Sequence, residues 1–175
     1  MIYLGIDPGS SAMGVCLAHE GGHDPRATTV VPRGKDARQR TLSAVEQLRY
    51  LFGNRLLQGE VTLCVEWQEH RRGREKNPQA VLEVQAYSGL AIAVAALAYH
   101  PARLLTPTPF QWKGQVAKKV HTPQLWAAFR QAGGRLWDGE PMHKANPDAM
   151  DAYGLAVWAI EQGRVSDFVD AWKGD

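Results

Sequence analysis

Four carboxylates stand at positions from which they could act together. Asp7 ends an alternating apolar run and precedes a Pro-Gly turn, and Glu66 ends a second β-rich run. Asp148 and Asp151 are three residues apart near the start of the last helical pattern, so they share one helix face. A single acid at such a position is usually a solvated or capping residue, so a functional prediction requires that the four converge.

Clustered carboxylates repel one another unless a positive charge lies between them. Mg²⁺ meets this need because it prefers hard oxygen ligands and binds through a few carboxylates together with substrate phosphate. Two such ions about 4 Å apart can activate a water molecule and stabilise the leaving oxygen of a phosphodiester. We therefore predict two Mg²⁺ ions per active site, replaceable by Mn²⁺, with these catalytic and metal-binding residues: Asp7, Glu66, Asp148 and Asp151.

The histidines do not suggest another metal. The six are scattered, and none has a spacing typical of zinc ligands. His143 precedes the last pair of acids, and we considered that it supports the metal ligands without binding the metal itself.

The elements that would position these acids can be predicted from periodicity and turn residues. Three alternating runs around a Gly21-Gly22 turn predict an antiparallel meander. Strands and helices then follow in the order βββαβαβ and further helices, and Asn146-Pro147 is typical of a helix start. The predicted class is α/β, a mixed sheet of antiparallel and parallel strands with helices on both faces. The predicted strands are 2–7, 12–18, 26–31, 61–66 and 104–105, and the predicted helices are 36–57, 78–99, a short Lys-rich segment, 122–132 and 147–161.

Length and charge constrain the domain organisation and the partners. The 175 residues are 45% hydrophobic, which suits one domain over residues 1–175. The net charge is only +2, but residues 84–137 contain no acid. A positive surface beside an acidic pocket suits a polyanion held over cations, although a chance run of solvated surface gives the same pattern. The bases of this acid-free segment are Arg103, Lys113, Lys118, Lys119, Arg130 and Arg135.

Compartment signals favour a cytoplasmic protein. Cys16 and Cys64 lie in apolar runs, as buried thiols in a reducing compartment do. No charged and then apolar leader opens the sequence. The apolar stretch 90–99 is too short to span a bilayer, so we expect no membrane association.

Three motifs, taken in order, resemble those of RuvC-type Holliday-junction resolvases. Residues 3–9, YLGIDPG, with Gly14-Val15 shortly after, resemble the opening strand of that family. Residues 64–66, CVE, resemble its second motif, and residues 148–152, DAMDA, its closing Asp-x-x-Asp-Ala motif. The order, the separations and the total length agree, so the resemblance covers most of the chain.

The resemblance implies an RNase H-like fold and a homodimer that places paired nicks in four-way DNA junctions with divalent metal. This is a crossover-junction endodeoxyribonuclease of DNA recombination and repair, in a bacterial or phage-infected cell. It also implies that basic residues before the last motif contact DNA, for which Trp112-Lys113 and Lys118-Lys119 are the counterparts here. A basic loop next to Glu66 adds further predicted DNA contacts: Arg71, Arg72 and Arg74.

One position departs from the family pattern. Well-studied members carry an aromatic residue three positions beyond the motif glutamate, where it helps to open the junction. Here that position is Glu69, with Trp67 and His70 nearby. The contacts at the junction core are therefore expected to differ, as in a divergent, phage-type member.

Other functions remain open at this point. The acids alone fit any RNase H-like nuclease, including one that cleaves RNA–DNA hybrid or branched DNA generally. Residues 5–11 also resemble the first phosphate loop of actin-like ATPases and sugar kinases, which need two domains and more than 175 residues. A non-catalytic junction-binding protein would gain nothing from four acids beside a phosphate backbone. The apolar helix at 78–99 either covers the sheet or packs against its twin in a dimer.

Overall fold

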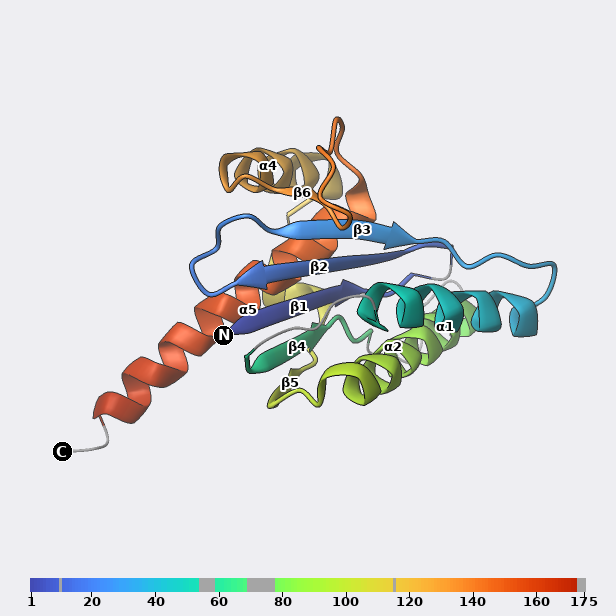
Figure 1. Cartoon of the computed structure of the whole chain (residues 1–175), viewed down its shortest axis with the longest axis horizontal. Helices are drawn as coiled ribbons and strands as arrows, with labels where there is room; N and C mark the ends of the chain where they lie inside the picture. Colours follow the sequence, from blue (N-terminus) through green and yellow to red (C-terminus); the bar gives the residue numbers. More distant parts are fainter. Residues whose placement is uncertain (10, 54–58, 69–77, 115, 173–175) are drawn as a thin grey trace.

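The structure is a computed structural model that describes residues 1–9, 11–53, 59–68, 78–114 and 116–172 (Figure 1). Its centre is a sheet in which six strands are described, in the order β5-β4-β1-β2-β3-β6. The hairpin-connected strands β1 (Ile2–Asp7), β2 (Met13–His19) and β3 (Arg26–Val30) are antiparallel, which confirms the predicted meander. The parallel strands are β4 (Val61–Val65) next to β1, β5 (Arg103–Leu105) next to β4, and β6 (Arg135–Leu136) next to β3.

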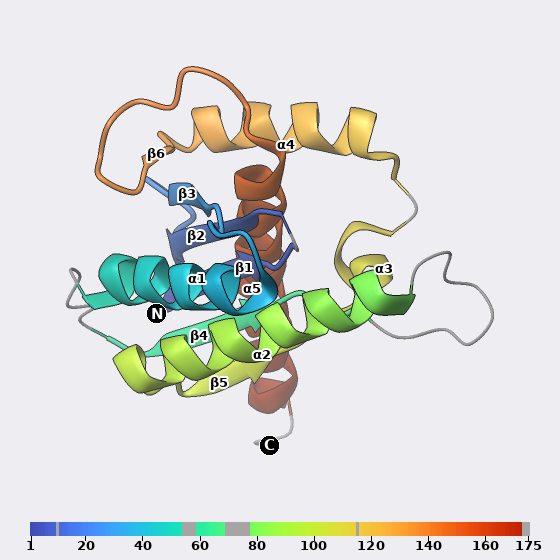
Figure 2. The ribbon, with the colours of Figure 1, turned by 90° about the vertical axis from the view of Figure 1, so that its right-hand side faces the viewer.

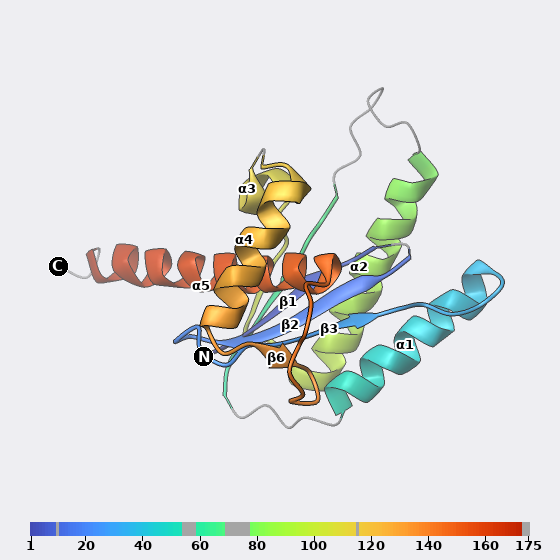
Figure 3. The same cartoon turned by 90° about the horizontal axis from the view of Figure 1, so that it is seen from above.

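Helices cover both faces of this sheet, as predicted. In Figure 2, α1 (Ala37–Gly53) and α2 (Pro78–Tyr99) lie in front of the sheet, and α5 (Pro147–Trp172) lies behind it. The short α3 (Pro109–Lys113) packs on α5, and α4 (Lys118–Gln131) lies across α5 (Figure 3). The predicted mixed α/β class is therefore confirmed.

Two element boundaries and one strand were predicted wrongly. Helix α4 begins at Lys118 rather than at residue 122, and Pro123 lies inside it, because a proline near a helix start removes one hydrogen bond without ending the helix. Helix α5 runs to Trp172 rather than to residue 161. Gly163 suggests a stop in the sequence, but here it lies inside the helix beside Tyr3, whose hydroxyl would be 2.7 Å from an added Cβ. Strand β6 has two residues, too few for a periodic signal.

The alternation of side chains along the strands produces a separate core on each face. Leu4, Ile6 and Leu63 point to α1 and α2, where they pack with Leu48 and Phe52. The opposite face packs against α4 and α5 with these buried residues: Tyr3, Cys16, Ala18, Cys64, Phe129, Met150, Tyr153 and Leu155. Both cysteines are buried free thiols, as predicted.

Helix α2 has a second possible interpretation. By length and composition alone it could cross a membrane, with a mean hydropathy of 1.7, and 28% of its apolar window is buried. The prediction that this region is too short considered only residues 90–99, whereas the helix is 22 residues long. In the structure, Tyr87, Ala91 and Val94 belong to the core beneath α1 and α2, so α2 is a packed helix of the domain.

Candidate active site

Two of the predicted acids emerge at the same end of neighbouring strands. Asp7 is the last residue of β1, and Glu66 directly follows β4. These strands are parallel, with Ile6 opposite Val65, and the Glu66 amide donates a hydrogen bond to the Ile6 carbonyl at 3.0 Å. Parallel pairing therefore brings two carboxylates that are 59 positions apart in the sequence to one edge of the sheet.

The other two acids are delivered by α5, which touches the sheet through glycines. Gly14 lies opposite Asp7 in the β1–β2 register. A Cβ on Gly14 would lie 1.9 Å from the Asp148 carbonyl oxygen, and one on Gly5 would lie 2.2 Å from the Ala152 carbonyl oxygen. Only glycine permits this approach, which sets Asp148 over the end of β1. The contact with α5 also accounts for Gly5 without a nucleotide, so the phosphate-loop alternative loses its support.

Local capping fixes where α5 starts. The Asn146 side-chain oxygen accepts hydrogen bonds from the amides of Asp148 and Ala149, at 3.1 and 3.2 Å. Asn146 is thus the N-cap and Pro147 the first helical residue, as predicted. Asp148 and Asp151 consequently occupy the first turn and the start of the second.

Helix α3 approaches the acids from the side of β5. The Trp67 amide donates to the Pro107 carbonyl at 2.9 Å, which ties the end of β4 to the segment leading into α3. Pro109 opens the helix, and Gln111 reaches back so that its side-chain oxygen accepts from the Thr108 amide at 2.7 Å. This tight turn places the last residues of α3, Trp112 and Lys113, beside Glu66.

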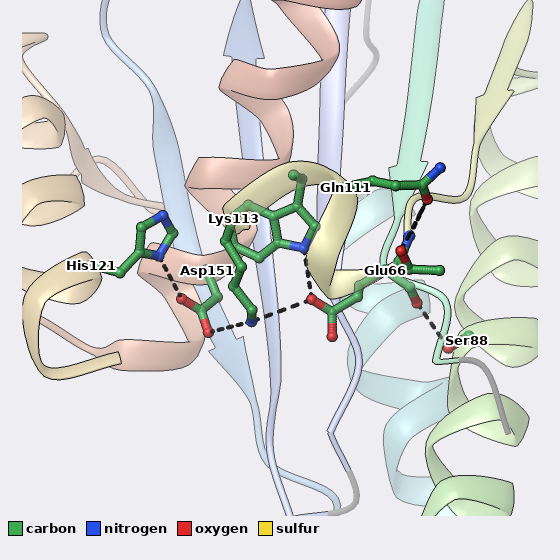
Figure 4. Close-up of polar contacts among 8 residues, drawn as sticks. Glu66, Ser88, Gln111, Lys113, His121 and Asp151 are labelled. Atoms are coloured by element: carbon green, nitrogen blue, oxygen red, sulfur yellow. Dashed lines mark hydrogen bonds and ion pairs between the residues drawn. The ribbon is translucent and has the colours of Figure 1, made fainter. Parts of the chain in front are cut away.

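The resulting polar contacts connect the end of β4 with α3, α4 and α5 (Figure 4). The Lys113 ammonium lies 3.4 Å from Glu66 Oε2 and 3.6 Å from Asp151 Oδ2, so it bridges the two acids. The indole N–H of Trp112 donates to the same Glu66 oxygen at 2.7 Å. His121 Nδ1, from α4, is 3.9 Å from Asp151 Oδ1.

The charges of the four acids influence one another. Burial raises the pKa of Asp7 well above its ordinary value, and the charges of Glu66, Asp151 and, more weakly, Asp148 raise it further. Burial alone would lower the pKa of Lys113, but the charges of Glu66, Asp151 and Asp7 raise it. Burial also lowers the pKa of His121, although Asp151 opposes that shift.

The chemistry of the side chains at this site, though not their present spacing, suits a hard cation. Glu66 and Asp151 are 2% and 3% exposed, and burying two carboxylates requires a compensating positive charge. In this arrangement the Lys113 ammonium provides it. Within the described residues, no three His, Cys, Asp or Glu side chains come close enough to hold one metal ion. The carboxylate oxygens gathered around the ammonium are nevertheless the ligands that Mg²⁺ prefers.

Comparison with solved structures identifies the architecture. A structure of Thermus thermophilus RuvC in complex with a Holliday junction substrate matches with a TM-score of 0.65 and 19% sequence identity, over 94% of this chain and 96% of that chain. A second Thermus thermophilus RuvC structure matches with the same score and identity, over 95% and 97%. The fold is that of RuvC. No protein-family model and no curated protein match the sequence.

Within this RuvC fold, the predicted site residues have different outcomes. Asp7, Glu66, Asp148 and Asp151 are brought together, whereas their role as metal ligands stays a prediction. Lys113 lies among the acids rather than on an outer surface, and Lys119 is exposed on α4, where Lys118 is the first residue. Some predicted or discussed positions lie outside the described residues: Glu69, His70, Arg71, Arg72 and Arg74.

Sequence reasoning missed two neighbours of the acids. Trp112 was considered only as a companion of Lys113 at the DNA, and His121 was not considered. His143, which was considered as a support for the metal ligands, is exposed. Neither Trp112 nor His121 stands at a recognisable spacing from an acid, because their proximity arises from how α3 and α4 pack on α5.

Proposed function

We propose that this chain is a metal-dependent endodeoxyribonuclease that resolves Holliday junctions by hydrolysing phosphodiester bonds. The observation that carries the proposal is the convergence of Asp7 with Glu66, Asp148 and Asp151 on a RuvC fold. A RuvC of that fold has been solved with a Holliday junction substrate. Bare acid clusters destabilise a protein, so a cluster that draws together three separate elements favours a functional role over a structural one.

The acids would hold two Mg²⁺ ions, for which Mn²⁺ can substitute. When bound, such ions supply the activated water and stabilise the charge on the leaving oxygen. Glu66 and Asp151 are buried and bridged by Lys113, so they are held ready rather than solvated. Lys113 now balances the charge of Glu66 and Asp151, and its ammonium would be free to contact a DNA phosphate if a bound cation supplied that charge instead.

The DNA would be held mainly through its backbone. Lys119 on α4 is exposed, and α4 packs on the helix that carries two of the acids. Together with Lys118 and the arginines at 71, 72 and 74, it provides the basic contacts expected to position a phosphate backbone. Affinity for the junction should thus be largely independent of the acid cluster.

Paired nicks require two active centres, and each chain has one acid cluster. A symmetric homodimer would place two such centres about the two-fold axis of a four-way junction. Both cuts could then occur within one bound lifetime, whereas a monomer would nick once and leave a singly cut junction to accumulate.

A junction extruded in a supercoiled cruciform plasmid tests the proposal. With Mg²⁺, the wild-type protein should convert the plasmid to linear DNA without a lasting nicked-circle phase. Asp7→Asn should abolish cleavage while junction binding in EDTA stays near normal, because affinity comes mainly from basic contacts. The matched control Asp138→Asn alters an exposed acid and should cut normally. Cleavage by Asp7→Asn at the wild-type rate would contradict the assignment.

Cleavage assays also distinguish a resolvase from the second candidate function, a general RNase H-like nuclease. This second candidate is considered because the acid cluster alone does not define the substrate. Parallel reactions on duplex DNA and on RNA–DNA hybrid of equal length should show little cleavage if the chain is a resolvase. Efficient cutting of either substrate, or accumulation of nicked circles by a monomer, would favour this candidate.

A further inference from the structure

The indole of Trp112 makes a contact that DNA binding does not explain. Its N–H donates to Glu66 Oε2 at 2.7 Å, well within hydrogen-bond range. The accepting carboxylate is 2% exposed, so water does not readily replace this donor. A hydrogen bond to a buried ionised group is stronger than one between neutral groups.

A glycine on α5 makes room for this indole. Gly154 follows Asp151 by three residues, so both lie on the same face of α5. A Cβ on Gly154 would lie 2.5 Å from Cζ3 of Trp112, and 3.1 and 3.3 Å from the two methyl groups of Leu125. The ring is thus seated directly against the helix backbone, and the missing side chain at residue 154 sets its depth.

The ring of Trp112 also contacts two neighbouring side chains. The His121 ring lies 5.3 Å away, centroid to centroid, and the Lys113 ammonium lies 4.7 Å above the ring. His121 and Lys113 are the same two groups that approach Asp151. Trp112 therefore touches the residues that surround both buried acids, and its position is determined by packing on several sides.

We propose that Trp112 is a positioning residue that orients the Glu66 carboxylate for metal binding, and that Gly154 holds Trp112 in place. This inference rests on the proposed function, because the metal ion that Glu66 would bind is the one used by the nuclease. Lys113 also contacts Glu66, but an ammonium on a flexible stem can leave for a phosphate. The indole carries a single N–H in a rigid ring, so it keeps one Glu66 oxygen fixed and leaves the other to face a cation.

The direct test measures Mn²⁺ affinity by electron paramagnetic resonance, without DNA, in wild-type protein and in Trp112→Phe. Phenylalanine keeps an aromatic ring and removes the donor. Loss of an outer partner of a metal ligand typically weakens metal binding by roughly 10- to 100-fold, which is the expected result. Junction affinity in EDTA should stay unchanged. Cleavage should need correspondingly more Mg²⁺ to reach half its maximal rate.

Two further variants separate positioning from general packing. Trp126→Phe changes another partly buried tryptophan, which stacks on Phe129 in α4, and should leave Mn²⁺ affinity at the wild-type value. Gly154→Ala should push the indole away and weaken Mn²⁺ binding as Trp112→Phe does. Because a phenyl ring does not extend as far as Cζ3, Gly154→Ala should cost little more in the Trp112→Phe background. The two changes should therefore be strongly non-additive.

The outcomes identify which idea fails. Wild-type Mn²⁺ affinity in Trp112→Phe, with or without a lower melting temperature, overturns the positioning role and leaves the nuclease proposal intact. Additive effects of Trp112→Phe and Gly154→Ala overturn the role assigned to Gly154. If the wild-type protein binds Mn²⁺ and cuts no junction, while Trp112→Phe weakens Mn²⁺ binding, the positioning role stands and the proposed function fails.

Discussion

The two faces of the sheet are packed in opposite ways. Under α1 and α2, large side chains such as Leu48, Phe52 and Leu63 hold the helices away from the strands. Under α5, glycines of the strands meet the helix backbone directly, at Gly5 and Gly14. The first face buries much apolar surface, which stabilises the fold. On the second face the side chains are small, so α5 lies very close to the strands. The four acids are on α5 or at the ends of strands on which it packs.

This difference indicates which face of the sheet fixes the positions of the acids. A helix resting on large flexible side chains can shift slightly as those side chains change rotamer. A helix resting on backbone atoms has no such freedom, because any added atom collides with a carbonyl. Asp148 and Asp151 are therefore positioned by the part of the core that contributes least apolar bulk, which includes Ala149, Ala152 and Ala156.

Among the packing changes, the largest combined effect on stability and cleavage should come from Gly14, where the strands and α5 are in direct contact. In Gly14→Ala the new Cβ would lie 1.9 Å from the Asp148 carbonyl oxygen, so α5 must move away from β2. Overpacking of this kind costs about 1–3 kcal/mol of stability. Displacement of catalytic groups by about 1 Å can cost roughly 100-fold in rate. Thermal unfolding and the cruciform cleavage assay measure the two effects separately.

A matched glycine on the other side of the sheet provides the control. Gly89 lies in α2, is exposed, and has no atom within 4 Å of an added Cβ. Gly89→Ala should stabilise the protein by about 0.5–1 kcal/mol, because alanine loses less backbone entropy in a helix. Cleavage should be unchanged. Equal effects of the two substitutions would show that the close approach at Gly14 does not matter.

The contrast between the faces also explains how much the sequence could predict. Leucine and valine spacing predicted α1 and α2 well, including both ends of α2 at residues 78 and 99. Gly163 suggests a helix end in the sequence, so the end of α5 at Trp172 was missed. The acids were found because strand ends and a helix start are local features. Trp112 and His121 were missed because contacts among α3, α4 and α5 have no local signature.

The next effect, in stability alone, should come from the bulky face. Leu48 is a fully buried residue of α1, and Leu48→Ala should lower the free energy of unfolding by about 2–5 kcal/mol through lost burial and a cavity. The cleavage rate of the folded fraction should stay at the wild-type value, because the acids lie on the other face and at the strand ends. Leu42→Ala, in the same helix but 53% exposed, should change stability by less than about 0.5 kcal/mol. A cleavage defect in Leu48→Ala below its melting temperature would show that the two faces are coupled.

The smallest effect should be a change in stability with pH at Asp7. This carboxyl is buried beside other acids, so ionising it destabilises the folded protein. Burial and the neighbouring carboxylates raise the pKa of Asp7 above its ordinary value of 3.8. At pH values below 3.8, Asp7 is protonated in both the folded and the unfolded chain. Its ionisation then has no effect on the free energy of unfolding. As the pH rises from 3.8 to the raised native pKa, the unfolded chain releases its proton first, and stability falls. Above the native pKa the full penalty applies.

Asp7→Asn removes this penalty, so it should raise the melting temperature in EDTA at neutral pH and should change it little near pH 3.8. For a chain of this size, each kcal/mol relieved corresponds to about 2–4 °C. The control Asp138→Asn, at an exposed acid, should show no such pH-dependent gain. Added Mg²⁺ should stabilise the wild-type protein more than Asp7→Asn, because an ion bound to the acids stabilises the native state by mass action. A melting temperature of Asp7→Asn that stays at or below the wild-type value at neutral pH would mean that Asp7 has a compensating partner and that the acids do not repel one another in the folded protein.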